Sequence, residues 1–296
     1  MPAQTHPGLS STKPPSSPAL RIANPITAGP PAHPTTETIA SAELRHYPSP
    51  MLEHPPSAPI ELLERGAPRD GAPQTLDRRL FMLLWVFECG WDPGPGAVID
   101  ALGRALDRRK APGVLYQDLL CPDGVAALSW SEHPAALIDG LHAATSEVGH
   151  LGLKPRPQMT MLGRTYSSGF EPDLQDWLID RPVRTVLNPD WPWAIWYPLR
   201  RSGAFERLEP KEKGAIMREH AAIGHAYGAQ DLAHDVRLAC HGLDAHDSEF
   251  VIGLVGRQLY PLSHVVQAMR GTRQTSEYIS QMGPFFVGRA VWQRGT

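Results

Sequence analysis

PKEKGAIMREHAAIGHAY, residues 210–227, has the pattern of an amphipathic helix that begins at Pro210. Its apolar positions recur at spacings of four, three and four, which places them on one face: Ile216, His220, Ile223 and Tyr227. His220 therefore takes a core position. A backbone carbonyl or a buried carboxylate could satisfy such a ring, but neutral imidazole is also a common ligand of metals and haem iron.

A strand is predicted directly after this helix, at residues 235–242, DVRLACHG. Alternation places Val236, Leu238 and Cys240 on one face, and Asp235, Arg237, Ala239 and His241 on the other. Arg237 is then either an ordinary exposed arginine on a sheet face or a fixed cation beside a reactive centre. A guanidinium in the second role binds an anionic substrate without titrating.

The same order of elements occurs twice along the chain. The first half predicts strands at 80–89, 114–120, 125–130 and 159–167, with a helix after the first strand and another at 134–144. The second half repeats the order with strands at 194–199, 235–242, 249–256 and 285–293, helices at 210–227 and 261–269, and a short added helix at 272–280. Each half has the order β-α-β-β-α-β, so we expect an α+β protein of two ferredoxin-like modules whose sheets join or pack together.

Composition sets the remaining boundaries. Residues 1–74 are rich in Pro, Ser and Thr and predict a disordered tail, with one weakly helical piece at 60–65; the modules then span 75–169 and 193–296, with a linker at 170–192. A net charge of −3 argues against nucleic acid as a partner. Three widely spaced cysteines, no apolar run of membrane length and no signal pattern predict a cytoplasmic protein.

Five strings, in order, resemble the chlorite dismutase and coproheme decarboxylase superfamily: WYPLRRSGAFERL (196–208), IMREHAAIGHAYG (216–228), RLACHGLDAHDSEFVIGL (237–254), MRGTRQTSEY (269–278) and GPFFVGRAVW (283–292). The resemblance implies a double ferredoxin-like subunit that forms rings and binds haem b in its C-terminal module. In the decarboxylases, iron coproporphyrin is instead the substrate.

The resemblance also assigns roles to residues. His220 corresponds to the proximal haem ligand, and counting back from Phe250 places the distal position at Arg237, with His234 or Asp235 as alternatives. Tyr197 keeps the tyrosine of the family's Y-P-M-x-K string, whereas Arg201 replaces its lysine. Three further positions are expected to line the cofactor: Phe205 in place of a tryptophan, Gln274 near the glutamate that orients the proximal imidazole, and Ile223 beside His220.

Four functions remain open on this basis. A haem b oxidoreductase would decompose chlorite or a peroxide, with Arg237 holding the anion. A coproheme decarboxylase would oxidise Tyr197 beside a propionate. A haem carrier or sensor, or a haem-free relative, would have no turnover. A non-haem metal site would use His234, His241, His246, Asp244 and Asp247, whose spacing matches no standard ligand motif.

Overall fold

The structure is a computed structural model that describes residues 59–295. The N-terminal module contains β3 (Phe81–Glu88), α1 (Pro95–Arg109), β4 (Gly113–Asp118), β5 (Gly124–Ser131), a helix built of α2 (Ala135–Leu137), a π-helical turn (Ile138–His142) and α3 (Ala143–Glu147), a two-residue strand β6 (Lys154–Pro155), and β7 (Met161–Arg164). Short 3₁₀ turns at Gly149–Leu151 and Pro157–Met159 lead into β6 and β7. The predicted order β-α-β-β-α-β is present.

The C-terminal module repeats that order. It contains β8 (Trp193–Arg201), α5 (Gly203–Glu206), α6 (Pro210–Ala229), β9 (His234–Ala239), β10 (Phe250–Gly256), α7 (Leu259–Arg270) and β12 (Phe286–Arg294). The short helix predicted at 272–280 is a π-helical turn, Gln274–Tyr278, followed by β11 (Ile279–Met282), which pairs with β8.

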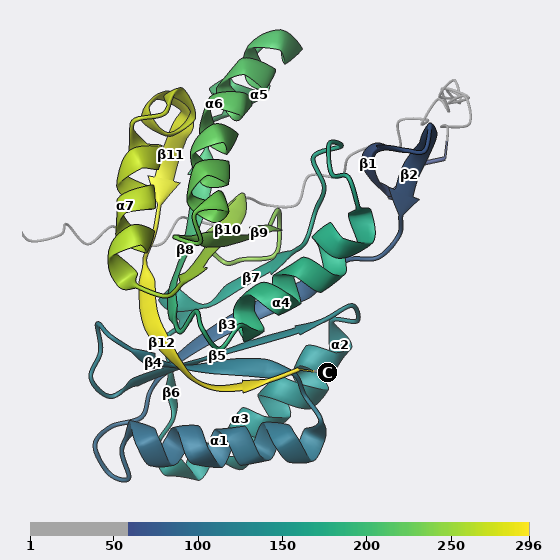
Figure 1. Cartoon of the computed structure of the whole chain (residues 1–296). Coiled ribbons are helices and arrows are strands. Elements are labelled where there is room, and N and C mark those ends of the chain that lie inside the picture. Colours follow the sequence, from purple (N-terminus) through teal and green to yellow (C-terminus); the bar gives the residue numbers. More distant parts are fainter. Residues whose placement is uncertain (1–58, 296) are drawn as a thin grey trace, which may run out of the picture. The chain divides into compact units, whose positions relative to one another are not determined.

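The two sheets join into one closed, antiparallel barrel (Figure 1). The strand order is β10-β9-β7-β3-β5-β4-β12-β8, and β8 also pairs with β10, which returns the order to its start. The modules meet at two seams, β12 with β4 and β7 with β9. The expected fold class is confirmed, with the sheets joined edge to edge.

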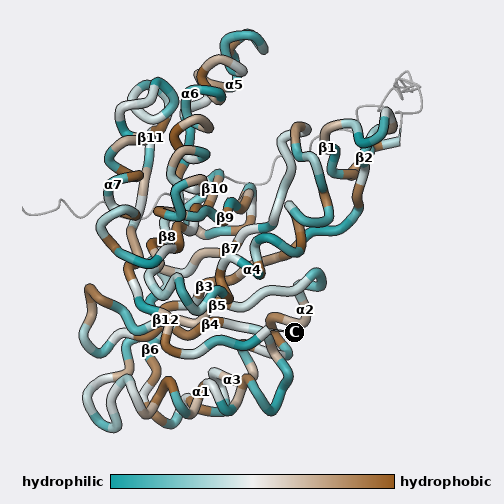
Figure 2. Tube along the Cα trace, viewed as in Figure 1, coloured by the Kyte–Doolittle hydropathy of each residue, from teal (hydrophilic) through white to brown (hydrophobic). Residues whose placement is uncertain are grey.

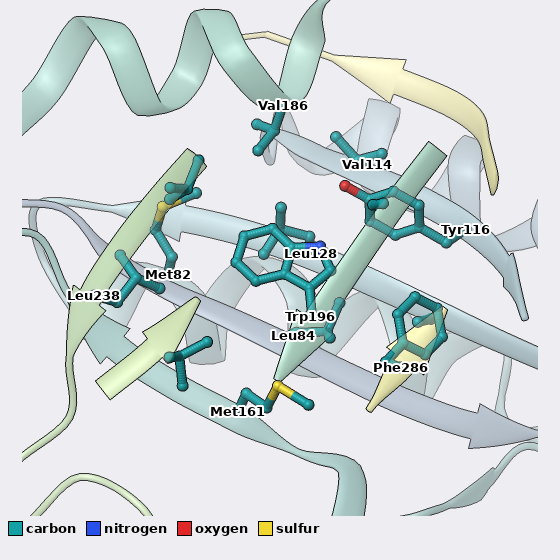
Figure 3. Close-up of a cluster of buried hydrophobic side chains, with 14 of the residues drawn as sticks. Met82, Leu84, Val114, Tyr116, Leu128, Met161, Val186, Trp196, Leu238 and Phe286 are labelled. Carbon is teal, nitrogen blue, oxygen red and sulfur yellow. The ribbon is translucent and has the colours of Figure 1, made fainter. Parts of the chain in front are cut away.

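The barrel interior is the largest core of the protein. Trp196 lies among Met82, Leu84, Leu128, Met161 and Phe286 (Figure 3). The indole leaves no space for a side chain opposite it, since a Cβ at Gly253 would lie 2.5 Å from two ring carbons. In Figure 2 the hydrophobic colour follows the barrel strands, as expected for a sheet rolled around its apolar face.

The outer face of each half-barrel is covered by that module's own helices. Leu102 and Leu106 of α1 pack with Leu115 of β4 and Leu141 in one buried cluster. In the other module, Leu262 and Val265 of α7 pack with Ile195 and Tyr197 of β8. Four of the predicted site residues lie on α6 or on this second outer face: His220, Ile223, Tyr197 and Arg237.

The predicted tail needs a correction where the structure describes it. Residues 64–76 form a hairpin of β1 (Glu64–Arg69) and β2 (Ala72–Leu76), and residues 60–63 have no helix. Asp70 and Gly71 both have positive φ angles, as a tight hairpin turn requires. Asp-Gly is a strong turn signal, which the surrounding proline-rich composition masked. The rest of the predicted tail, residues 1–58, lies outside the described residues.

The predicted linker is largely helical. It contains a π-helical turn at Asp176–Asp180 and α4 (Arg181–Leu187). Val186 of α4 is buried in the barrel core, so this segment covers the end of the barrel in addition to connecting the modules (Figure 3). No helix within residues 59–295 is long and apolar enough to span a membrane.

Candidate functional site

Helix α6 presents the predicted stripe toward the rest of the module. Ile216 is fully buried, and His220, Ile223 and Tyr227 are partly buried. Lys211 and Arg218 are exposed on the opposite side, whereas Glu219 is exposed at the edge of the stripe, where its Oε2 accepts from the backbone N–H of Arg273 at 3.3 Å. Ile223 and Tyr227 contact the apolar cluster on the outer face of β8 and β10. The stripe derived from spacing is therefore the inward face of the helix.

The His220 ring has one polar neighbour, Thr272. Its Nδ1 lies 3.5 Å from the Thr272 hydroxyl oxygen, a long contact for a hydrogen bond. The Thr272 hydroxyl donates its own proton to the carbonyl of Met269 at 2.7 Å, so its oxygen can only accept from Nδ1–H. A proton on Nδ1 leaves the Nε2 lone pair available to a metal ion.

The surroundings also favour a neutral imidazole. Burial lowers the pKa of His220, and the positive charge of Arg237 lowers it further, while Asp235 and Glu219 act in the opposite direction. Neutral imidazole is the form that binds iron. Strand β9, which carries Arg237 and Asp235, packs against α6.

Strand register brings the two predicted catalytic residues into one row. Ile252 of β10 lies opposite Arg237 of β9 on one side and opposite Tyr197 of β8 on the other. Residues opposite each other in register point to the same face of a sheet. Arg237 and Tyr197 therefore share the outer face that α6 and α7 cover.

Arg237 is fixed by a neighbour on its own strand. Its Nε lies 2.7 Å from Oδ2 of Asp235, and the two side chains are 36% and 31% exposed. Two residues of the predicted linker also reach this pair: Trp177, whose ring lies beside the Arg237 guanidinium, and Arg181, which pairs with Asp235. Sequence reasoning missed both, because the contacts join positions more than fifty residues apart.

Tyr197 is almost completely buried. Its ring stacks on Phe285 with 4.7 Å between centroids. Burial raises the pKa of the phenol, and the charge of Asp235 adds to this effect. The hydroxyl therefore stays protonated at physiological pH and can act as a hydrogen-bond or hydrogen-atom donor.

Arg201 and Phe205 occupy a second cluster, at the end of β8. The Arg201 guanidinium binds the Glu249 carboxylate through Nε and Nη2, and Nε lies 3.1 Å from each carboxylate oxygen. The guanidinium lies over the rings of Phe205 and Phe250, and Phe205 makes an edge contact with Tyr278. Arg201 is therefore neutralised by Glu249, and Phe205 is part of the local core.

Gln274 is buried, but it is not the group beside the His220 imidazole. That neighbour is Thr272, two residues earlier, so the expected amide partner is replaced by a hydroxyl. Oε1 of Gln274 has no hydrogen-bond partner within the part of the chain that the structure describes. A neutral hydroxyl attracts the Nδ1 proton less strongly than a carboxylate does, so the His220 ring is a less basic ligand than an imidazole paired with glutamate.

His234 and Asp235, the alternatives to Arg237 for the distal position, lie on opposite faces of strand β9. His234 points to the barrel side of β9, where its ring stacks on Trp191 with 3.6 Å between centroids and its Nε2 lies 2.8 Å from Oδ1 of Asp231. Asp235 shares the face of Arg237 but is committed to two arginines. Among residues 59–295, no three His, Cys, Asp or Glu side chains come close enough to hold a metal ion, which removes the predicted alternative at His234, His241, His246, Asp244 and Asp247.

Comparison with known proteins agrees with this arrangement. Residues 150–291 match the family model described as chlorite dismutase. A haem-binding protein from Thermus thermophilus has a similar structure, with a TM-score of 0.57 at 18% identity over 72% of this chain and 92% of that chain. A putative chlorite dismutase gives a TM-score of 0.56 at 15% identity, covering 72% and 95% of the two chains.

A third solved structure is the chlorite dismutase of Candidatus Nitrospira defluvii in complex with imidazole. It has a TM-score of 0.54 at 14% identity, over 73% of this chain and 92% of that chain. No curated protein sequence matches the chain. At these identities the solved structures establish the fold alone.

Proposed function

We propose that the chain is a haem b enzyme with His220 as the iron ligand and Arg237 as the anion-binding group, because residues 150–291 match the chlorite dismutase family model. The substrate class is a small oxyanion such as chlorite, or a peroxide. The haem-binding relative from Thermus thermophilus and the imidazole complex of the Nitrospira chlorite dismutase support a haem site in this fold.

One arrangement carries the proposal: His220 lies on the inward face of α6, and Arg237 lies on the face of β9 that α6 and α7 cover. Helix α6 is not packed flush against the sheet, since Ile216 is its single fully buried residue. Ile223 and Ile252 supply apolar surface there, which suits a porphyrin.

Haem bound at this position would supply the iron chemistry that cleaves a Cl–O or O–O bond. The protein's contribution is binding and orientation. Arg237 can hold an anion by its terminal N–H groups, so the substrate and the anionic fragment stay within the site. His220 supplies Nε2, while Thr272 accepts from Nδ1–H and fixes the ring.

Tyr197 supports coproheme decarboxylation as a second candidate. It lies in the same row as Arg237, is shielded from solvent, and keeps its phenolic proton. Arg201 counts against this function, because Glu249 neutralises the cation that stands where the family has a lysine. Tyr197→Phe should abolish peroxide-driven conversion of iron coproporphyrin if this reaction is real, and should leave chlorite decomposition intact.

The deciding experiment is a titration of the full chain with haem b and, separately, with iron coproporphyrin, followed by addition of chlorite to the haem b complex at an oxygen electrode. Prompt oxygen release supports the chlorite reaction. Tight haem binding without oxygen release supports the decarboxylase, a peroxidase or a haem carrier. Absence of a Soret shift with either porphyrin would refute the proposal.

Two further properties belong to the same proposal. The protein assembles as a homo-oligomeric ring, as its family does, and it works in the cytoplasm, in keeping with its three free thiols, Cys89, Cys121 and Cys240. Light scattering on the purified full chain measures the first property, and fractionation of the source cells measures the second.

A further inference from the structure

The segment that joins the two modules reaches the proposed anion-binding arginine. Trp177, in the π-helical turn before α4, and Arg181, the first residue of α4, both contact the charged pair on β9. Neither residue belongs to the ferredoxin-like repeat. This part of the chain therefore contributes to the site as well as connecting the modules.

Asp235 is shared between two arginines, one for each carboxylate oxygen. Oδ2 lies 2.7 Å from Nε of Arg237, and Oδ1 accepts from Nη2 of Arg181 at 2.8 Å. Burial by itself would raise the pKa of this carboxyl, but the charges of Arg237 and Arg181 outweigh burial and hold the pKa below its ordinary value. Asp235 is thus ionised at neutral pH, and the cluster carries one net positive charge.

The indole of Trp177 restrains both guanidinium groups. Its ring centroid lies 4.4 Å from Cζ of Arg181 and 4.7 Å from Cζ of Arg237. The ring is itself held in place, because its Nε1 donates to the carbonyl of Tyr166 at 3.1 Å. Contact with a fixed indole restricts the plane of a guanidinium, and an ion pair with a neighbouring carboxylate further restricts its movement.

We propose that Asp235, Arg181 and Trp177 position Arg237 for anion binding. Within residues 59–295 the two terminal Nη groups of Arg237 have no hydrogen-bond partner, and it is Nε that lies nearest to Asp235 in their ion pair. This leaves the fork-shaped end of the guanidinium free for a small anion. The inference rests on the proposed function, because it assigns the anion to the haem site.

Positioning matters here because an arginine side chain has many rotamers. Restricting it before the anion arrives removes an entropic cost that would otherwise fall on binding. The charges of Asp235 and Arg181 cancel, and Trp177 is neutral. If charge were their only contribution, the three residues together would not change the affinity for an anion. Orientation and charge therefore make opposite predictions for Asp235, and the two can be separated.

The test compares Asp235→Asn with Arg181→Gln in the ferric, haem-loaded full chain at pH 7. Fluoride is the anionic probe, and imidazole is a neutral probe that needs no guanidinium. Positioning predicts that both variants bind fluoride about tenfold more weakly, the size of one charge-assisted hydrogen bond, with imidazole affinity unchanged. A pure charge effect predicts opposite signs, with tighter fluoride binding in Asp235→Asn, and that result would overturn the proposal.

Arg184→Gln is the matched control. It removes one positive charge from the same helix, but Arg184 is largely exposed and pairs with Asp176. Its fluoride affinity should equal that of the wild type. If Asp235→Asn fails to fold, Trp177→Phe replaces it: the smaller ring keeps the packing but weakens the cation–π contact, so we expect about a threefold loss of fluoride affinity.

A second measurement does not depend on haem. In the full chain before haem is added, the Nε–H proton of Arg237 should exchange slowly with solvent in ¹⁵N NMR spectra, because the ion pair with Asp235 and the contact with the Trp177 indole hold the guanidinium in place. Slow exchange should persist in Arg184→Gln and disappear in Asp235→Asn. Unchanged exchange in Asp235→Asn contradicts the positioning role, whereas failure to bind haem contradicts only the proposed function.

Discussion

Helices α1 and α6 hold the same place in the two modules but pack differently. Of the 15 residues of α1, five are fully buried: Val98, Leu102, Gly103, Ala105 and Leu106. Of the 20 residues of α6, only Ile216 is. Gly103 lets Trp292 of β12 approach so closely that an added Cβ would lie 2.9 Å from the indole nitrogen, whereas a Cβ at Gly228 of α6 would meet only the Ala233 carbonyl oxygen at 3.9 Å.

The difference shows that the same arrangement of a helix on a sheet can form either a hydrophobic core or a binding site. In the N-terminal module, leucine side chains fill the space between helix and sheet. In the C-terminal module, the facing surfaces of α6 and the sheet carry His220 and Arg237, two polar side chains that are partly exposed. We expect mutations in the first space to change stability and mutations in the second to change binding.

The largest effect is expected from His220→Ala. Removing the ligand should weaken haem binding by at least about 100-fold, because the ligand itself contributes more than its hydrogen-bond partners do. The free energy of unfolding without haem should hardly change, since the side chain is only partly buried. A Soret titration measures the first effect. His225→Ala, on the exposed side of the same helix, is the control and should bind haem normally.

Leu102→Ala tests the other half of the comparison. The side chain is 1% exposed and lies in the N-terminal cluster, so its truncation should destabilise the protein by about 2–5 kcal/mol. Urea denaturation measures the loss. Haem affinity measured at low urea should match that of the wild type; a reduced affinity would mean that the two spaces are coupled.

The ion pair at the end of β8 predicts a pH-dependent loss in Glu249→Gln. Burial would raise the pKa of Glu249, but hydrogen bonds and charge from Arg201 lower it below the ordinary value of 4.5. A carboxyl with a depressed pKa stabilises the fold above its unfolded pKa, and the contribution disappears as the pH falls through its folded pKa.

The variant should therefore be less stable than the wild type by about 1–3 kcal/mol at pH 7, with the gap closing below pH 4.5. Denaturation curves at several pH values measure this. Glu147→Gln, which breaks exposed pairs with Arg108 and Arg109 in the other module, should show no measurable change at either pH. A gap that stayed constant with pH would argue against an ionised Glu249.

A matched pair of glycine substitutions should give the smallest effects, with opposite signs. Gly103→Ala forces a methyl group against Trp292 and should cost about 1–3 kcal/mol. Gly228→Ala meets only an ordinary contact and should stabilise α6 by about 0.4–1 kcal/mol, because alanine restricts the unfolded chain. Thermal melts measure both, and equal signs would contradict the difference in packing.

Much of the fold could be predicted because its signals are local. Alternation along 235–242 assigns Arg237 to the face opposite Val236 and Leu238, and burial agrees. The spacing of Ile216, His220, Ile223 and Tyr227 identifies the inward face of α6. The hairpin at 64–76 was missed even though Asp70-Gly71 is a turn signal, because composition over a long window outweighed two residues.

Periodicity and side-chain chemistry are properties of neighbours along the chain, so the amino-acid sequence alone established two β-α-β-β-α-β units and marked His220 and Arg237 as exceptional. The partners of those residues come from distant segments: Thr272 beside His220, and Trp177 and Arg181 beside Arg237 and Asp235. These contacts join segments that are far apart in the sequence and form only in the folded chain. Contacts between distant segments leave no periodic pattern in a single sequence, so only the tertiary structure could identify the partners of His220 and Arg237.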